Sequence, residues 1–363
     1  MARPQRWLSA AVVTVIALVG LLAAGRWLQP RLDRETPVGS STRLPPTSPV
    51  LTSQPVVTAT RPPGSPGITK TAATAAQVDA IAVTPGSVWV AAGGLVLRVD
   101  PVTGRRVVVP DIETGQPPVV QVTVGAGAVW ATTTGGRLLR IDPRTTRVTA
   151  SLSVPAQGVA ADAGGVWVVC CWAGAHRGQL TRVDPASGRV VKAIPLPGHP
   201  QAVGIGPSGV WVRGAEGSIW RVEPASNRVV ATIRLPSSNG QSYRADTGDP
   251  GGDIAVTNDG VWVSNPGSAT VRRIDPRRNQ VTDDLVEADG SDLTVAADGV
   301  VWATSDTRLL GRGGGSEVLG PRRNLHELDT DRITATAAAR YGGLWLGTPQ
   351  GLFHINRNLL REG

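Results

Sequence analysis

Residues 166 to 180, VWVVCCWAGAHRGQL, contain the only two cysteines of the chain, Cys170 and Cys171, and one of its four histidines, His176. These side-chain types serve redox or metal chemistry. Cys-x-x-Cys spacing is missing, so a structural zinc site is not indicated. Adjacent Cα atoms lie about 3.8 Å apart, closer than in most disulfides, so bonding the pair requires a strained ring. Three alternatives remain: a vicinal disulfide, two free thiols under a loop, and a redox-active site.

Other polar and aromatic residues accompany this stretch wherever the chain departs from an internal repeat. One group lies in the insert at residues 237–252, and others lie in segments that link repeat copies. Function on a repeat fold is expected in such loops, since the strands are committed to packing. The predicted ligand-binding residues are Cys170, Cys171, Trp172, His176, Arg177, His199, Tyr243, Arg244, Asp246, Asp249, Asp289 and Asp292.

An internal repeat defines the elements that must position these residues. Each copy has an apolar stretch, a Gly-containing turn, an alternating Val-Trp-Val type run, a second alternating run and a third run such as RVVATI. That is four short strands in about 40 residues, the pattern of a β-propeller blade. Seven tryptophans mark the copies and are expected in the core: Trp89, Trp130, Trp167, Trp211, Trp262, Trp302 and Trp345.

The last copy supplies only three strands before the chain nearly stops. The stretch GITKTAAT at 67–74 has the pattern of an outer strand and no earlier copy to join. An N-terminal strand that completes the C-terminal blade would remove an exposed sheet edge. We therefore predict an all-β fold for residues 67–363: a seven-bladed β-propeller of four-stranded blades, closed by an N-terminal strand and preceded by one transmembrane or signal helix.

Acidic residues recur before proline in five copies, and an arginine stands two positions before each acid. A short acceptor before a turn with Pro at its second position bonds the turn's own amides, so we interpret the acids as turn residues. The arginines are interpreted as solvated side chains or partners between blades. The pairs are Arg98 with Asp100, Arg140 with Asp142, Arg182 with Asp184, Arg221 with Glu223, and Arg273 with Asp275.

The N-terminal region predicts attachment to a membrane. Residues 7–25, WLSAAVVTVIALVGLLAAG, carry no charge and are long enough for a helix to cross a hydrocarbon core. The segment is a retained anchor or a signal peptide cut after Gly25. Residues 1–6 are then cytoplasmic, and the Pro-, Ser- and Thr-rich residues 26–66 form a linker. The localisation expected is a single-pass membrane protein with an extracytoplasmic propeller, secreted if the segment is cleaved.

The net charge of +8 does not indicate nucleic-acid binding. Residues 1–66 contain seven arginines against Asp33 and Glu35, so much of the excess lies outside the repeats. Arginines within the repeats recur singly and form no basic helix. With two cysteines, the fold depends on its apolar core rather than on a disulfide framework.

At GVWVSNPGSATVRRIDPRRNQV (260–281) the repeat resembles that of seven-bladed YVTN-type and quinoprotein-like propellers, and of virginiamycin B lyase-like proteins. The resemblance covers residues 67–357 and implies the fold and the packing between blades. The lyases hold magnesium with histidine and an acid on one face, and no matching set is found here. Some quinoprotein propellers have a vicinal disulfide over their cofactor. This chain resembles those propellers only in having the cysteine pair.

The sequence favours a binding or sensor module for a protein, peptide or cell-envelope glycan, acting through one loop face, rather than an enzyme. A metal-dependent lyase acting on a small cyclic substrate and a scaffold without ligand remain as alternatives. We expect no catalytic residue, no cofactor and no metal.

Overall fold

A computed structural model of the chain describes residues 68–112, 117–170, 178–215, 217–235, 252–265, 270–286, 292–295, 299–305, 308–312, 323–324, 332–339, 343–356 and 360. The chain divides into two units, Met1–Gln54 and Pro55–Gly363, and every described residue belongs to the second. The predicted helix at 7–25 and linker at 26–66 lie outside the described residues. In the described part, no helix has the length and apolar character needed to cross a membrane.

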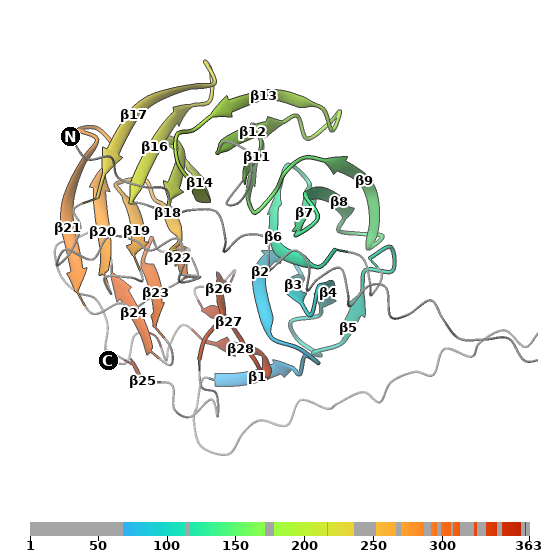
Figure 1. Cartoon of the computed structure of the whole chain (residues 1–363). Coiled ribbons are helices and arrows are strands. Elements are labelled where there is room, and N and C mark those ends of the chain that lie inside the picture. The colour runs from blue at the N-terminus through green and yellow to red at the C-terminus, as the bar shows by residue number, and fades with distance from the viewer. Residues whose placement is uncertain are drawn as a thin grey trace, which may run out of the picture. The chain divides into compact units, whose positions relative to one another are not determined.

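The described residues form seven four-stranded antiparallel sheets, numbered here in chain order (Figure 1). Sheet 1 contains β2 (Val78–Thr84), β3 (Ser87–Ala92), β4 (Leu95–Val99) and β5 (Arg106–Val108). Sheet 2 contains β6 (Val119–Gly125), β7 (Ala128–Thr133), β8 (Arg137–Asp142) and β9 (Arg147–Ser153). Sheet 3 contains β10 (Gly158–Asp162), β11 (Gly165–Cys170), β12 (Gln179–Val183) and β13 (Val190–Pro195). Sheet 4 contains β14 (Pro200–Gly206), β15 (Gly209–Gly214), β16 (Ser218–Glu223) and β17 (Arg228–Arg234).

The remaining sheets follow the same order except for the last. Sheet 5 contains β18 (Ile254–Val256), β19 (Val261–Asn265), β20 (Thr270–Asp275) and β21 (Gln280–Val286). Sheet 6 contains β22 (Leu293–Val295), β23 (Val301–Ser305), β24 (Arg308–Arg312) and β25 (Arg323–Asn324). Sheet 7 contains β26 (Ala335–Ala338), β27 (Leu344–Thr348), β28 (Gly351–Ile355) and, as its fourth strand, β1 (Ile68–Ala72).

Strand β1 comes from the segment that the sequence assigned to closure. It pairs antiparallel with β28, with Ile68 opposite Ile355 and Ala72 opposite Leu352. The first strand of the chain therefore completes the last sheet, as the short final copy of the repeat predicted. The outer edge of β28 is covered by this pairing.

The innermost strands follow one another in a circle. Contacts run from β2 through β6, β10, β14, β18, β22 and β26 and back to β2, an arrangement of the β-propeller type (Figure 1). The inner strands approach closely: a Cβ built on Gly125 would lie 2.2 Å from the carbonyl oxygen of Ala161 in the next sheet. Glycine at this position permits the sheets to meet, because any larger residue collides with backbone.

The repeat tryptophans lie in the second strands and are buried. Their exposed fractions run from 0% for Trp89, Trp130 and Trp211 to 6% for Trp302. The apolar clusters join one sheet to the next: Trp89 packs with Val119 and Val122 of sheet 2, for example. Burying about 200 Å² of one indole at about 25 cal/mol per Å² contributes about 5 kcal/mol before ordering entropy is subtracted.

An arginine covers each of five of these rings. The guanidinium carbon lies 5.1 Å from the ring centroid in the Arg182 and Trp167 pair and 5.3 Å in the Arg221 and Trp211 pair. Register explains the pairing, since each arginine stands directly opposite its tryptophan on the neighbouring strand. The cation and the electron-rich ring face attract each other. The other three pairs are Arg98 with Trp89, Arg140 with Trp130, and Arg273 with Trp262.

Some of these arginines also reach the next sheet. Nη1 of Arg182 donates to the carbonyl oxygen of Pro224 at 2.7 Å and to Oδ1 of Asn227 at 3.0 Å. Asn227 has a φ of 54°, the left-handed conformation that the turn between the third and fourth strands requires. Arg182 and Arg221 therefore link neighbouring sheets, whereas the hydrogen bonds of Arg140 and Arg273 stay within their own sheets.

Candidate ligand-binding face

Each sheet has two ends with different connections. Gly158 at the start of β10 pairs with Val169 near the end of β11, and Cys170 pairs with Gln179 at the start of β12. The links between sheets and the loops between second and third strands therefore emerge at one end, which we call the link end. The turns within the first and last strand pairs lie at the opposite end, called the turn end.

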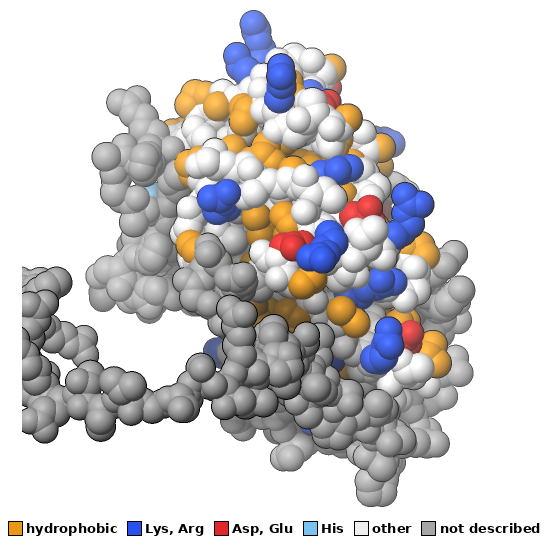
Figure 2. Space-filling view, turned by 90° about the vertical axis from the view of Figure 1, so that its right-hand side faces the viewer, with side chains coloured by type: hydrophobic (Ala, Val, Ile, Leu, Met, Phe, Trp, Pro, Cys, Tyr) orange, Lys and Arg blue, Asp and Glu red, His pale blue; other side chains and the backbone are white. Residues whose placement is uncertain are grey.

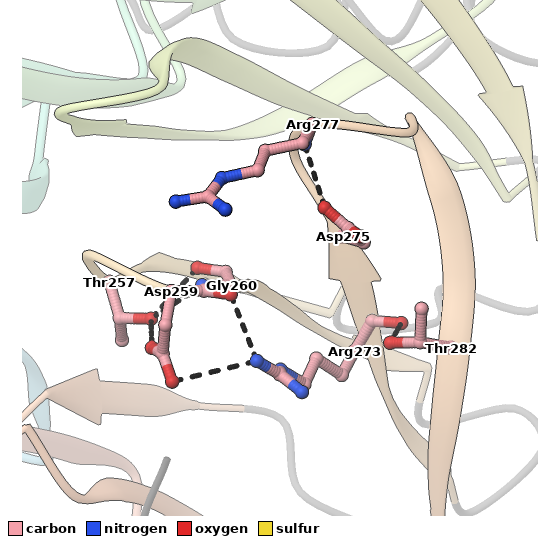
Figure 3. Close-up of polar contacts among 7 residues, drawn as sticks. All are labelled: Thr257, Asp259, Gly260, Arg273, Asp275, Arg277 and Thr282. Carbon is pink, nitrogen blue, oxygen red and sulfur yellow. Dashed lines mark hydrogen bonds and ion pairs between the residues drawn. The ribbon is translucent and has the colours of Figure 1, made fainter.

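The turn end repeats one set of contacts. In sheet 5, Nη2 of Arg273 donates to the carbonyl oxygen of Asp259 at 2.9 Å, and Oγ1 of Thr257 donates to Oδ1 of Asp259 at 2.7 Å (Figure 3). The backbone N–H of Arg277 donates to Oδ1 of Asp275 at 2.8 Å, in the following turn. Arg273 therefore ties the third strand of the sheet to its first turn, and Asp275 holds the second turn.

The acids before proline behave as turn residues in four sheets. The backbone N–H groups of Val102 and Thr103 donate to Oδ1 of Asp100 at 2.9 and 2.8 Å. These backbone hydrogen bonds hold the pKa of Asp100 below its ordinary value, and the same cause lowers the pKa of Asp142 and Asp275. For Asp184, the backbone and hydroxyl bonds from Ser187 lower the pKa. The turn-end acids are thus engaged in local structure.

The structure describes three of the predicted ligand-binding residues, and all three lie at the link end. Cys170 is the last residue of β11, and Asp292 directly precedes β22. His199 directly precedes β14, and its carbonyl oxygen accepts a hydrogen bond of 2.8 Å from the N–H of Ala215. The other nine lie outside the described residues: Cys171, Trp172, His176, Arg177, Tyr243, Arg244, Asp246, Asp249 and Asp289.

Cys170 is disulfide-bonded, and the described residues include no free cysteine. The chain has one other cysteine, Cys171, so the vicinal bond is the pairing that the composition permits within one chain. The structure therefore excludes one of the three alternatives for the pair, two free thiols. A disulfide at this position restrains the strand end from which the loop of sheet 3 departs.

Sequence reasoning missed a buried arginine at the link end. Arg213, in β15 of sheet 4, has an exposed fraction of 0%. Its Nε donates to the carbonyl oxygen of Ser264 in sheet 5 at 3.0 Å, and its Nη1 donates to Oε1 of Gln201. The arginine therefore joins the inner strand of its own sheet to the second strand of the next.

Asp253, also missed from the sequence, continues this polar chain. Its N–H donates to Oγ of Ser264 at 2.7 Å, and its Oδ2 accepts a hydrogen bond of 3.1 Å from the N–H of Leu293 in sheet 6. Burial raises the pKa of Asp253 above its ordinary value, although the backbone bonds and the charge of Arg213 oppose this shift.

Asp292 extends this series of polar contacts from sheet 6 to sheet 7. Its Oδ2 accepts hydrogen bonds from the N–H of Thr336 and from Oγ1 of Thr336, the latter at 2.7 Å. Burial, followed by the negative charge of Asp253, raises the pKa of Asp292 well above its ordinary value. The pKa of Asp292 is raised further than that of Asp253, so Asp292 is the carboxyl of the two that keeps its proton to higher pH. The pair therefore holds one proton at a pH where isolated carboxyls have lost theirs.

Strand register shows that these acids share one position in the repeat. Asp253 and Asp292 each stand two residues before the residue that pairs with the sheet's tryptophan, and so does Gln121 in sheet 2. Oε1 of Gln121 accepts a hydrogen bond of 2.6 Å from the N–H of Val159 in sheet 3. In all three sheets, the side chain at this position bonds a backbone N–H of the next inner strand.

No group of three histidine, cysteine or acidic side chains suited to a metal ion occurs among the described residues. A comparison with protein-family models finds none that matches the chain, and a search of curated proteins finds no relative.

Proposed function

We propose that the chain is a closed seven-bladed β-propeller, held outside a membrane by its N-terminal segment, that binds a protein, peptide or cell-envelope ligand at the link end. The fold part of this proposal is supported by the seven four-stranded sheets and the circle of inner strands. The tether is supported by the uncharged residues 7–25 and the Pro-, Ser- and Thr-rich linker.

We choose the link end as the ligand-binding face because the two ends of the sheets differ. At the turn end, the Asp-Pro turns and the arginines above the tryptophans perform the same structural task in successive sheets. At the link end, the residue two positions after the tryptophan differs between adjacent sheets: Val169 in sheet 3, Arg213 in sheet 4 and Ser264 in sheet 5. On a repeat fold, the end at which the copies differ is the expected location of a ligand site.

The polar chain from Arg213 to Thr336 supports a rigid platform beneath this face. It crosses sheets 4 to 7 through side-chain bonds to the next sheet. Hydrogen-bonded networks of this kind fix the relative placement of the elements they join. Loops that depart from sheets 3 to 6 would therefore be presented by a preorganised base, which lowers the entropic cost of binding.

Photo-crosslinking in cells that make the full chain tests the face. A photoreactive amino acid replaces Pro197, exposed in the link before β14, and in a second variant Ala186, exposed at the turn end. We expect adducts from position 197 and none from position 186. Alanine at His176, Tyr243 and Arg244 should abolish the adduct while leaving the melting temperature unchanged. Equal adducts at both positions, or none at 197, contradict the proposal.

A further inference from the structure

The N-terminal segment of the chain joins the sheets at the turn end. Strand β1 begins at Ile68, which pairs with Ile355, the last residue of β28. Ile355 lies opposite Leu344, the first residue of β27, whereas the loop between β27 and β28 lies at the link end. Ile68 is therefore at the turn end, on the outermost strand of sheet 7. The proposed tether reaches the fold here and not at the proposed ligand-binding face.

Arginines outnumber acids at the turn end of sheets 1 to 5. Each of these sheets has a segment that runs from its third-strand arginine into the following turn. The segments are residues 98–106, 140–147, 182–189, 221–228 and 273–278, and they contain 13 arginines and five acids. The turns between first and second strands add two acids, Asp162 and Asp259. The end that receives the tether therefore carries a net positive charge.

Many of these arginines are exposed, and four of them share one position. Sheets 1 to 4 each place an exposed arginine opposite the acid that opens the turn, and these residues are Arg105, Arg147, Arg189 and Arg228. The carboxylates of Asp100, Asp142 and Asp184 accept hydrogen bonds from backbone N–H groups of their own turns. The acids are thus held against the backbone, while the guanidinium groups face solvent.

Exposed valines accompany the arginines. Val102, in the turn of sheet 1, is 89% exposed. The valines that directly follow Arg106, Arg189 and Arg228 are also exposed, and they are Val107, Val190 and Val229. Figure 2 views the side on which β5 and β9 lie and shows Lys and Arg spread among hydrophobic side chains, with fewer carboxylates. Basic and aliphatic side chains in alternation suit the interface of a membrane, where the charges meet headgroups and the aliphatic groups meet the acyl boundary.

We infer that the turn end lies on the anionic surface of the membrane that holds the tether. This inference rests on the tether of the proposed function. Anionic headgroups attract basic side chains only at short range, so the attraction acts on the end that the tether brings to the bilayer. One charge repeated in four sheets suits a fluid surface without fixed shape. The link end, where the sheets differ, then faces away from the membrane and is open to a ligand.

Fluorescence quenching by lipid tests this orientation. The full chain is reconstituted in vesicles of equal parts phosphatidylcholine and phosphatidylglycerol, with a quencher on some headgroups. A fluorescent amino acid replaces Ala225 at the turn end or, in a second variant, Pro197 at the link end; both positions are exposed. We expect quenching at 225 to exceed that at 197 about threefold or more. The difference should vanish in phosphatidylcholine alone and at high salt, because the attraction needs anionic lipid and is screened.

Charge variants separate the lipid contact from folding. R105E/R147E/R189E/R228E should lower quenching at 225 to the level at 197, because the turn end then repels the headgroups. The matched variant R105K/R147K/R189K/R228K keeps the charge and should keep the quenching. R137E/R234E reverses two exposed charges at the link end and should change nothing. Melting temperatures of the three variants show that each remains folded.

The outcomes distinguish this inference from the proposed function. Equal quenching at the two positions overturns the inference, as does a difference that persists without anionic lipid or after the fourfold reversal to glutamate. A chain that separates from the vesicles in a flotation assay contradicts the tether and the inference together. Loss of crosslinking from position 197 alone contradicts only the proposed ligand-binding face.

Discussion

Nη1 of Arg221 donates a hydrogen bond of 3.1 Å to Oδ1 of Asn279, which lies in the next sheet. The same guanidinium lies over Trp211 and bonds the carbonyl oxygen of Ser208 through Nε at 2.9 Å. One side chain therefore supports the core of its own sheet, a turn of that sheet and a turn of its neighbour. This relationship explains why the arginine recurs in the repeat.

Replacing Arg221 with alanine should lower the free energy of unfolding by about 2 to 4 kcal/mol, because several hydrogen bonds and a cation–π contact are lost together. Arg221→Lys should recover part of this loss, since lysine keeps the charge without the planar fork. Thermal and urea denaturation measure the effect. Arg144→Ala removes an exposed arginine and should change stability little; equal losses from both would contradict the assigned role.

The hydrogen bond between an arginine of one sheet and an asparagine in a turn of the next is missing between sheets 2 and 3. A substitution in sheet 3 could add it. Gly188 occupies the turn position of Asn227 and Asn279, with a φ of 66°. Nη1 of Arg140, in the preceding sheet, donates to Oγ1 of Thr149 in its own sheet at 3.4 Å rather than to an asparagine of the next turn. Asparagine tolerates this backbone conformation, and a Cβ at Gly188 would meet only a leucine methyl, at 3.9 Å.

We therefore expect Gly188→Asn to raise stability by about 1 kcal/mol. Gly188→Ala should lower it, because alanine is strained at positive φ and offers no acceptor. In an Arg140→Ala background the gain from asparagine should disappear. A gain of the same size in both backgrounds, measured by melting temperature, would show that the guanidinium is not involved.

The carboxyl pair predicts a dependence of stability on pH. Asp253 and Asp292 have pKa values raised in the folded state, so the fold retains a proton that the unfolded chain releases. Their contribution to stability is complete below the ordinary carboxyl pKa and is lost as pH rises through the raised values. Melting temperature measured from pH 4 upward should therefore show a decline that is attributable to this pair.

Asn at position 292 should remove that decline. Its amide N–H can donate to Asp253 while its oxygen still accepts from Thr336, which reproduces the protonated acid. Asp292→Asn should thus stabilise the protein at neutral pH and flatten the pH profile. Asp253→Asn should instead destabilise it, because both Asp253 oxygens accept backbone bonds, from Ile254 and Leu293. Identical effects of the two variants would contradict the assignment of the retained proton to Asp292.

Deleting residues 67–73 tests the closing strand. Without β1, the edge of β28 is unpaired and the last sheet has three strands. We expect a lower melting temperature and a greater tendency to aggregate, since an uncovered edge pairs with other chains. A deletion of equal length at 40–46, within the predicted linker, serves as the control and should leave the melting temperature unchanged.

The sequence predicted the sheets and their closure because both depend on local, repeated signals. Tryptophan spacing located the second strands, and the three-strand final copy pointed to residues 67–74. Four of the five acids before proline were assigned correctly as turn residues, since their partners lie two and three residues away.

Features that depend on contacts between sheets were harder to predict from the sequence. The partner of Arg182 is Asn227, 45 residues along the chain, so the sequence left the arginines with two roles. Asp292 was selected for its link position, but Asp253 and Arg213 were missed. The equivalence of Asp253 and Asp292 with Gln121 becomes visible only through strand register, because β18 and β22 have three residues each and too little alternation to align by eye.

The pairing of β1 with β28 has a consequence for how the chain matures. Synthesis proceeds from the N-terminus, so Ile68 leaves the ribosome long before its neighbour Ile355 exists. A chain that ends early has no β28 for β1 to pair with, and Val78 of the first sheet lacks the glycine of β27 that it packs against. The last sheet can therefore close only after residues 351–355 have been synthesised.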